Sequence, residues 1–320
     1  MKMKIIIIIL IVCSNVYGLE LSNQIFIQFF KIYPNQSSLN ENFRLKRAQI
    51  KLNKKINNYI SIEFAPDFQS VSNSQIKPYL KSAFVSFNHY NKIIYTFGYQ
   101  FSSIYGPLRM NWRNPFIDGV AGVVNDFHEV ADFGLSFKWN IKNDIIFKSG
   151  IFNGTGYKTN ENDKYKKIEF IIFKGDEILK DESNNYGTIF SLEPYENNES
   201  KMFFDYRYGL FFGKFKNLNR VGIEYHHKSN NENHIKNDLI TIFSTNKINK
   251  KINLVNKFEL LRKSSNNKNF MSHAFSNVNY TVGILISLNS NLAISPSSKF
   301  SNIQKEKTAF FKLNLIFKYN

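Results

Sequence analysis

The chain has 320 residues, of which 43% are hydrophobic and 16% aromatic, and its formal net charge at pH 7 is +17. Its one cysteine is Cys13, so the chain after that point has no disulfide, thiolate nucleophile or cysteine-bound metal. Excess positive charge favours anionic partners. Lys, Asn, Ile and Phe are all abundant, as AT-rich coding would give, so the charge alone does not establish selectivity.

The N-terminus has the pattern of a secretory signal. Two lysines precede an unbroken apolar run at residues 5–12, and small or tolerated residues follow. The run is far shorter than the ~20 residues of a transmembrane helix. We therefore predict a signal peptide over 1–18 and one exported domain over 19–320, a setting that excludes nucleic acid as a partner. A lipoprotein signal ending at Cys13 is the alternative, with Val12 where a small residue is expected.

Strand-like segments recur from one end of the chain to the other. The clear ones cover residues 24–33, 43–53, 59–68, 80–88, 93–101, 131–140, 145–153, 202–213, 221–227, 236–245, 252–263, 278–287 and 308–320. Weaker candidates cover 167–174, 186–193 and 291–295. Together they predict about 16 strands, and any even number from 12 to 16 fits the pattern.

The last segment shows the alternation of polar and apolar residues most clearly. One face carries Ala309, Phe311, Leu313, Leu315, Phe317 and Tyr319. The other face is mostly polar, and the segment is about long enough to cross a bilayer as a tilted strand. Lipid tolerates only helices and closed sheets. A soluble β-sandwich also alternates, but 32 Phe and 17 Tyr favour a transmembrane antiparallel β-barrel of a Gram-negative outer membrane.

The connections between segments support a barrel. Short turns at 54–58, 89–92, 141–144, 214–220 and 246–251 alternate with longer polar links at 34–42, 69–79, 102–130, 154–166 and 264–277. Outer-membrane barrels alternate short periplasmic turns with long outer loops in this way.

The period of two also predicts which side chains line the lumen. If Ala48, Ile50 and Leu52 face lipid, the basic pore-lining residues are Arg47, Lys51, Lys138, Lys148, Arg207, Lys257, Lys312 and Lys318. The acidic ones are Glu63, Asp132, Asp205, Glu224 and Glu259. Bases outnumber acids, which favours anions, although a slip of one residue would reverse every assignment.

Several motifs resemble the phosphate-selective porin family of Gram-negative bacteria. They are Phe43-Arg-Leu-Lys-Arg-Ala-Gln-Ile50, Lys81-Ser-Ala-Phe-Val-Ser-Phe87 with Thr96-Phe-Gly-Tyr-Gln100, Ala131-Asp-Phe-Gly-Leu-Ser-Phe137, and Gly150-Ile-Phe-Asn-Gly-Thr-Gly156. The resemblance covers roughly 43–156 and returns in the terminal strands. It implies a 16-stranded homotrimeric porin whose third outer loop folds into the pore. The short chain, the poorly matching middle third and the lysine-rich lumen depart from the family, and favour general anion preference over phosphate specificity.

The segment 102–130 lies where the resemblance places that constricting loop. Its charged residues are Arg109, Arg113, Asp118, Asp126 and Glu129. Cations opposed to acids at a narrow point would give a transverse field and limit the size of solutes. Ordinary solvent-exposed loop charges are the alternative interpretation.

The sequence thus predicts a passive outer-membrane diffusion channel, a porin, for small hydrophilic solutes, with a preference for anions that could include phosphate. We expect outer-membrane lipids, the barrel assembly machinery and small anions such as phosphate as partners, and no enzymatic activity, cofactor or metal. His226 and His227 are adjacent on a strand and so point to opposite faces. Two alternatives remain: a closed structural or adhesin barrel, favoured by inward bulky residues such as Phe211 and Leu261, and a secreted ligand-binding sandwich.

Overall fold

The computed structural model describes residues 18–33, 41–72, 75–90, 92–142, 144–161, 164–180, 182–197, 199–232, 235–263, 277–303 and 306–319. The predicted signal segment, 1–18, lies outside these residues except for Gly18. Among the described residues, no helix is both long enough and apolar enough to cross a membrane.

The described chain consists almost entirely of strands. They are β1 (Leu19–Tyr33), β2 (Glu41–Lys55), β3 (Ile60–Ser72), β4 (Gln75–His89), β5 (Ile93–Phe101), β6 (Ala131–Asn140), β7 (Ile145–Phe152), β8 (Lys167–Gly175), β9 (Ser183–Glu196), β10 (Met202–Lys216), β11 (Asn219–Asn230), β12 (Lys236–Lys247), β13 (Ile252–Lys263), β14 (Asn277–Ser287), β15 (Leu292–Ile303) and β16 (Glu306–Tyr319). Two short helices, α2 (Tyr105–Trp112) and α3 (Ala121–Val124), lie between β5 and β6.

The strands form one closed antiparallel barrel in which each strand pairs with its sequence neighbours. The first and last strands close it, with Asn23 opposite Tyr319 and Tyr33 opposite Ala309. Closure leaves no strand edge with unpaired backbone groups, which is the condition for crossing lipid as a sheet. The predicted 16-stranded β-barrel is confirmed.

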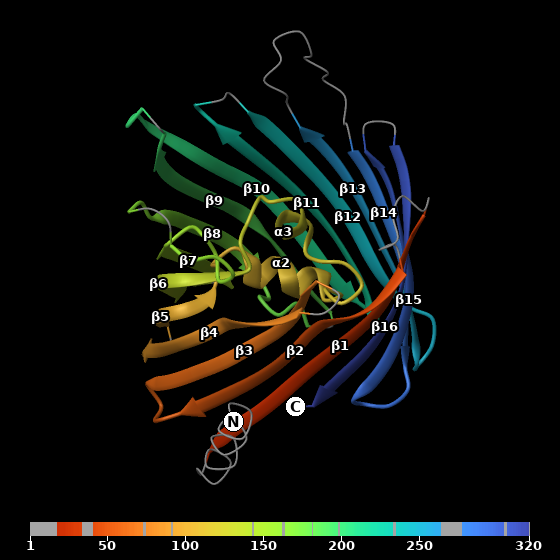
Figure 1. Cartoon of the computed structure of the whole chain (residues 1–320). Helices are drawn as coiled ribbons and strands as arrows, with labels where there is room; N and C mark the ends of the chain where they lie inside the picture. The colour runs from red at the N-terminus through yellow and green to blue at the C-terminus, as the bar shows by residue number, and fades with distance from the viewer. Residues whose placement is uncertain are drawn as a thin grey trace.

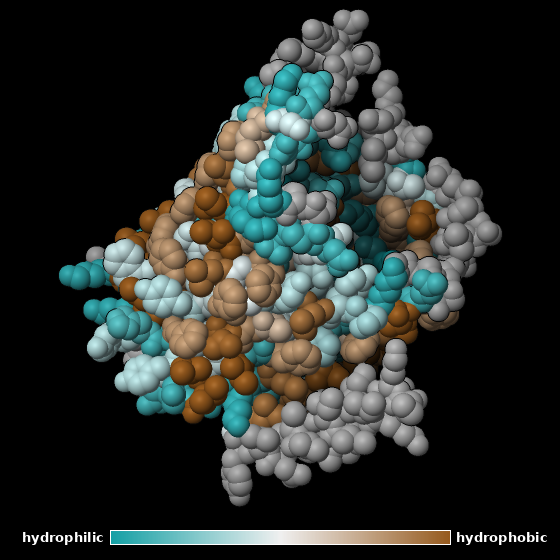
Figure 2. Space-filling view, turned by 60° about the vertical axis from the view of Figure 1, so that its left-hand side comes forward, coloured by the Kyte–Doolittle hydropathy of each residue, from teal (hydrophilic) through white to brown (hydrophobic). Residues whose placement is uncertain are grey.

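The outer face of the barrel is apolar, and the alternation in the sequence is its cause. In β16, Leu313, Leu315 and Phe317 are 49%, 40% and 39% exposed, whereas Asn314 and Ile316 between them are buried toward the interior. The wall seen in Figure 2 is largely brown, with hydrophilic residues toward its borders. Such a band is what a bilayer requires of a barrel's outside.

Two segments were predicted wrongly in detail. The link expected at 69–79 is mostly strand, because β3 continues to Ser72 and β4 begins at Gln75. The short candidate at 291–295 is the start of β15, which continues to Ile303. Beyond the apolar band, both faces of a strand meet polar surroundings, so the ladder continues where the alternation of side chains has ended.

The segment 102–130, here called the inner loop, leaves the end of the barrel that carries the long connections and folds into the interior. Figure 1 shows α2 and α3 within the ring of strands. It is the third connection at this end of the barrel, after the one between β1 and β2 and the one between β3 and β4. The opposite end, with short turns such as 56–59 and 217–218, is called the short-turn end.

Candidate functional site

The inner loop packs an apolar side against the barrel wall. Leu108, Trp112 and Ile117 are at most 1% exposed and belong to one hydrophobic cluster with inward-facing wall residues. The wall contributes Phe26, Ile171, Phe173, Ile189, Phe211, Phe243, Val255 and Ile316. Part of the barrel interior is therefore a packed core and not an open lumen. Burying such side chains contributes about 1.5–3 kcal/mol each, which makes the loop a fixed part of the wall.

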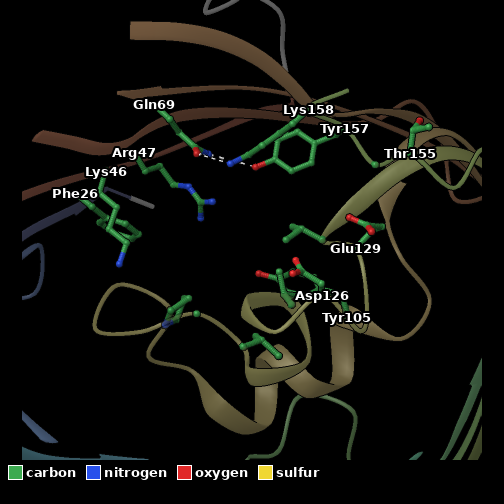
Figure 3. A pocket seen from close by; sticks show the side chains of 16 residues that line it. Phe26, Lys46, Arg47, Gln69, Tyr105, Asp126, Glu129, Thr155, Tyr157 and Lys158 are labelled. Carbon is green, nitrogen blue, oxygen red and sulfur yellow. Dashed lines mark hydrogen bonds between the residues drawn. The ribbon is translucent and has the colours of Figure 1, made fainter. Parts of the chain in front are cut away.

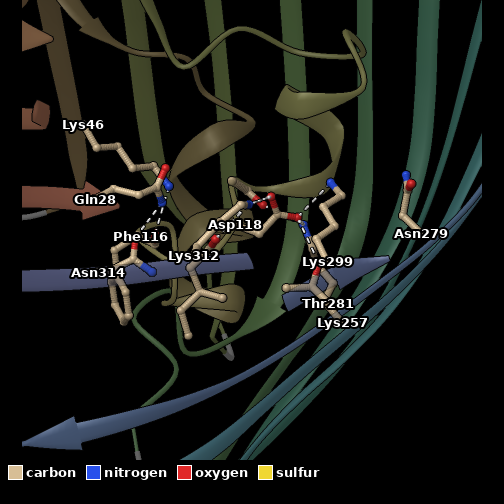
Figure 4. A network of polar contacts seen from close by, with 12 residues as sticks. Gln28, Lys46, Phe116, Asp118, Lys257, Asn279, Thr281, Lys299, Lys312 and Asn314 are labelled. Carbon is tan, nitrogen blue, oxygen red and sulfur yellow. Dashed lines mark hydrogen bonds and ion pairs between the residues drawn. The ribbon is translucent and has the colours of Figure 1, made fainter. Parts of the chain in front are cut away.

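A buried ion-pair network anchors the middle of the inner loop. Asp118 Oδ2 lies 2.6 Å from Lys257 Nζ and 3.2 Å from Lys299 Nζ, and Asp118 Oδ1 lies 3.9 Å from Lys312 Nζ. Figure 4 shows these lysines converging on Asp118 from β13, β15 and β16. Burial opposes ionisation of Asp118, but the three lysines hold its pKa well below the usual range.

Further hydrogen bonds attach the rest of the inner loop around the interior. Lys46 Nζ donates to the Phe116 carbonyl (2.9 Å) and Lys257 Nζ to the Gly119 carbonyl (2.9 Å). Glu169 Oε2 accepts from the Ser103 backbone amide at 2.9 Å. Additional contacts come from Asn185 to Asn111, Thr245 to Asn114 and Arg220 to the Met110 carbonyl. Contacts from so many strands define one position for the loop.

A cavity of about 420 Å³ lies between the free side of the inner loop and the wall. Lys46, Arg47 and Lys158 line it together with Asp126 and Glu129. Figure 3 shows the cations of β2 across the cavity from the two carboxylates of the loop. Charges of opposite sign thus face each other across open space, the arrangement that produces a transverse field.

A β-bulge turns two consecutive cations into this cavity. In the β1–β2 ladder, Phe26 pairs with Arg47 but Ile27 pairs with Leu45, so Lys46 is the extra residue. Strict alternation would place Lys46 on the lipid face beside Ala48, yet its ammonium group reaches the inner loop. Lys46 was not among the predicted pore-lining residues for this reason, because a bulge leaves no clear pattern in a polar stretch of sequence.

A second bulge buries another lysine in the same region. Ala65 pairs with Ser82 and Pro66 with Leu80, which leaves Lys81 as the extra residue. Its side chain is 0% exposed, and its Nζ lies 5.4 Å from the centroid of the Phe101 ring. Within the part of the chain that the structure describes, this ammonium group has no hydrogen-bond partner.

The long connection after β7 supplies the remaining side of the cavity. Lys158 is exposed, and its Nζ lies 5.4 Å and 5.6 Å from the ring centroids of Tyr79 and Tyr157. Gln69 Nε2 donates to Tyr157 Oη at 3.2 Å. Burial, with Asp67 nearby, raises the pKa of Tyr157 to about 12, so this phenol stays neutral. The sequence offered only a polar link here, without a motif.

The short-turn end of the interior has its own ion cluster. Glu177, in the turn after β8, pairs with Lys138 at 2.5 Å and also with Lys148. Burial opposes ionisation of Glu177, but these two lysines lower its pKa to about 2. Arg220 joins this turn to the inner loop by donating to the Leu179 and Met110 carbonyls. Two lysines expected to line the lumen thus share one carboxylate.

Other predicted site residues lie in several environments. Lys51 Nζ is 2.6 Å from Glu63, and Arg207 Nη2 is 3.0 Å from Glu193. Lys318 Nζ lies 5.4 Å from the Phe116 ring centroid. Of the two loop arginines, Arg113 is exposed and Arg109 lies over Phe101 at 5.3 Å, neither lining the cavity with Asp126 and Glu129.

The structure brings together two histidines that are 98 residues apart. His226, facing inward, has Nδ1 3.1 Å from His128 Nε2 and Nε2 3.1 Å from Glu224 Oε2. His227 faces outward, with Nδ1 2.8 Å from Asp238 Oδ1. Among the described residues, no three His, Cys, Asp or Glu side chains gather as metal ligands would. The pairing with His128 had no signal in the sequence.

Comparison with known proteins gives a fold and no family. No protein-family profile matches the chain, and no curated protein matches its sequence. Similar solved structures include an anion-selective porin from Comamonas acidovorans (TM-score 0.68, 8% identity, covering 94% of this chain and 99% of that one). Others are Salmonella typhi OmpF in complex with daunomycin (0.67, 8%, 93% and 97%) and the trimer form of OmpT, an outer membrane protein of Vibrio cholerae (0.64, 11%, 94% and 99%). The chain has the fold of Gram-negative outer-membrane porins.

Proposed function

We propose that the protein is a passive, anion-preferring diffusion channel of a Gram-negative outer membrane, carrying small hydrophilic solutes. The observation that carries this proposal is the cavity in which Lys46, Arg47 and Lys158 face Asp126 and Glu129. Three basic side chains oppose two carboxylates there. An excess of fixed positive charge at a narrow point favours anions.

Phosphate belongs to the proposal as one candidate solute. A ladder of arginines would favour it, because a guanidinium group matches phosphate in a bidentate manner. The cavity contains one arginine and two lysines, and Arg47 Nε lies 3.2 Å from Asp67. We therefore propose a general preference for small anions, with phosphate among them and not singled out.

The proposal extends to assembly and processing. Removal of residues 1–18 would leave the barrel domain 19–320, inserted among outer-membrane lipids by the barrel assembly machinery. A homotrimer is proposed with the trimer form of Vibrio cholerae OmpT as its support. The protein is assigned transport and no reaction. Native electrophoresis of the detergent-solubilised protein, compared with a heat-denatured sample, measures the oligomer.

Single-channel recording of refolded residues 19–320 in planar bilayers, with a KCl gradient, tests the channel. Discrete steps with an anion-selective reversal potential are expected. The double variant Lys46→Gln, Lys158→Gln should lower the anion preference. Lys201→Gln, at an exposed pair with Glu199 outside the cavity, is the matched control and should not. If the double variant kept its anion selectivity, the cavity would not be the site that determines ion preference. Recordings with added phosphate then test whether the channel is specific for phosphate.

A second function is favoured by the filled part of the interior. The inner loop and the wall share an apolar cluster, and ion pairs bury Lys257 and Glu259 to 1% exposure. A barrel filled in this way would serve as a structural or adhesin protein without conductance. Properly folded protein that never conducts in the same recordings would select this alternative.

A further inference from the structure

Three buried titratable side chains that contact one another have no part in the proposed channel function. Glu224 and His226 on β11 and His128 in the inner loop are 1%, 0% and 3% exposed. Their contacts, both of 3.1 Å, run in series from the wall to the loop. We call these three residues the histidine latch. Its contact with the inner loop is made by His128, which lies in the sequence between Asp126 and Glu129, the two carboxylates of the cavity.

The protonation pattern of the latch follows from its geometry. A carboxylate only accepts hydrogen bonds, so His226 Nε2 must donate to Glu224. Where His226 accepts at Nδ1, His128 Nε2 is the donor to it. His128 Nδ1 is left with a lone pair, and it has no hydrogen-bond partner among the described residues. A second proton on His128 would therefore go to a nitrogen that has no hydrogen-bond acceptor among the described residues.

A proton on His128 Nδ1 would have no hydrogen-bond acceptor, and most of the charged groups that act on it are basic. Burial, followed by the neighbouring basic groups His226, Arg207, Lys167 and Lys228, lowers the pKa of His128 well below its ordinary value. The acids on the surrounding strands have basic partners of their own. Glu169 pairs with Lys167, and both lie on β8. Glu193 on β9 and Asp205 on β10 both pair with Arg207 on β10, and Asp205 also pairs with Lys228 on β11. Glu259 pairs with Lys257, and both lie on β13. Glu224 is occupied by His226.

The space around the latch is tight as well. A Cβ added to Gly122 would lie 2.9 Å from His128 Cδ2 and 3.3 Å from His226 Cε1. The backbone amides of Phe127 and His128 both donate to the Gly122 carbonyl, at 2.7 Å and 3.1 Å. The ring of His128 thus packs beside Gly122 with little room around it. We infer that a proton on its second nitrogen is accommodated most readily when the segment that carries it moves.

We propose that Glu224 and His226 are positioning residues that hold Asp126 and Glu129 at the cavity through His128, and that acid releases them. The sign follows from linkage. A lowered pKa in the latched state means that the released state binds the proton more tightly. The latch is complete above the ordinary histidine pKa of about 6.5, and each pH unit below it raises the ratio of released to latched loop by up to about tenfold.

The first test measures the anion-to-cation permeability ratio of refolded channels between pH 8 and pH 5. Unperturbed carboxyl groups titrate below this window, at about pH 4. We expect a step below pH 6.5 in the natural protein and none in His128→Gln, whose amide still donates to His226 without titrating. His89→Gln, at the end of β4, is the matched control and should keep the step. The same step in His128→Gln, or a conducting natural channel without one, would overturn the latch.

A second measurement does not depend on conductance, and so separates the latch from the proposed function on which its channel readout rests. Val124 is 44% exposed in the same part of the loop, and residues 19–320 contain no cysteine. A nitroxide attached through Val124→Cys should become more mobile between pH 7.5 and pH 5. The same label in a His128→Gln background should not change. Equal spectra at both pH values in the natural background would contradict the proposal, whether or not the protein conducts.

Discussion

Replacement of Asp118 by Asn tests whether the ion-pair network holds the inner loop in the barrel. The substitution keeps the size of the side chain but removes the negative charge shared by Lys257, Lys299 and Lys312. Breaking a buried pair by removing one partner costs about 3–5 kcal/mol. Glu259 still lies 2.8 Å from Lys257 and 3.7 Å from Lys299, so we expect the lower end of this range.

About 3 kcal/mol is roughly a hundredfold increase in the population of a displaced loop. Since the loop occupies the interior, its displacement should appear in single-channel recordings as larger and noisier conductance. Asp126→Asn removes the same charge from the same loop at an exposed position, so it should change ion selectivity without the noise. Conductance and noise in Asp118→Asn that match those of Asp126→Asn would refute the anchoring role of the network.

Three further outcomes follow from local geometry. Glu177→Gln should increase anion preference, measured as reversal potential, because it leaves Lys138 and Lys148 without their shared carboxylate. The exposed Glu199→Gln should not. The pKa of Glu177 is lowered to about 2, so its ion pairs should be complete above its ordinary pKa of about 4.5. They should be lost only as the pH falls through about 2. A change in conductance with its midpoint near pH 4.5 would contradict this. Gly98→Ala should destabilise the barrel by about 1–3 kcal/mol in urea titrations, since φ is +124° and the new Cβ would lie 2.3 Å from the Ala83 carbonyl. Gly106→Ala, with its nearest atom at 3.8 Å, should be nearly neutral, and equal effects would refute the strain argument.

The sequence predicted the fold well because lipid imposes one rule on every strand. Residues such as Phe311 and Leu313 must face outward wherever the barrel crosses the apolar band, and the period of two records this directly. The same rule does not apply beyond the apolar band, where β3 and β4 continue through residues that show no alternation of polar and apolar side chains. Strand number was therefore predictable, and strand length was not.

The candidate site was less predictable, because it depends on departures from that rule. Asp126 and Glu129 were identified in the loop, but the cations opposite them were only partly found. Lys46 lies at a bulge, where one extra residue reverses the face that a side chain occupies. Lys158 comes from a polar connection with no pattern of its own. Contacts between distant segments, as between His128 and His226, require the folded barrel before they can be recognised.

The formal charge of +17 also has a different meaning in the folded protein. Most interior bases have an acid beside them, as Lys51 has Glu63 and Arg207 has Glu193. Such pairs contribute little net field to a solute in the lumen, whatever their number. Selectivity should instead depend on cations whose nearest groups are neutral, such as Lys46 on a carbonyl and Lys158 above two tyrosine rings. Both of them lie at the cavity that Asp126 and Glu129 line, so substitutions there should change ion preference more than the removal of any paired lysine elsewhere in the barrel.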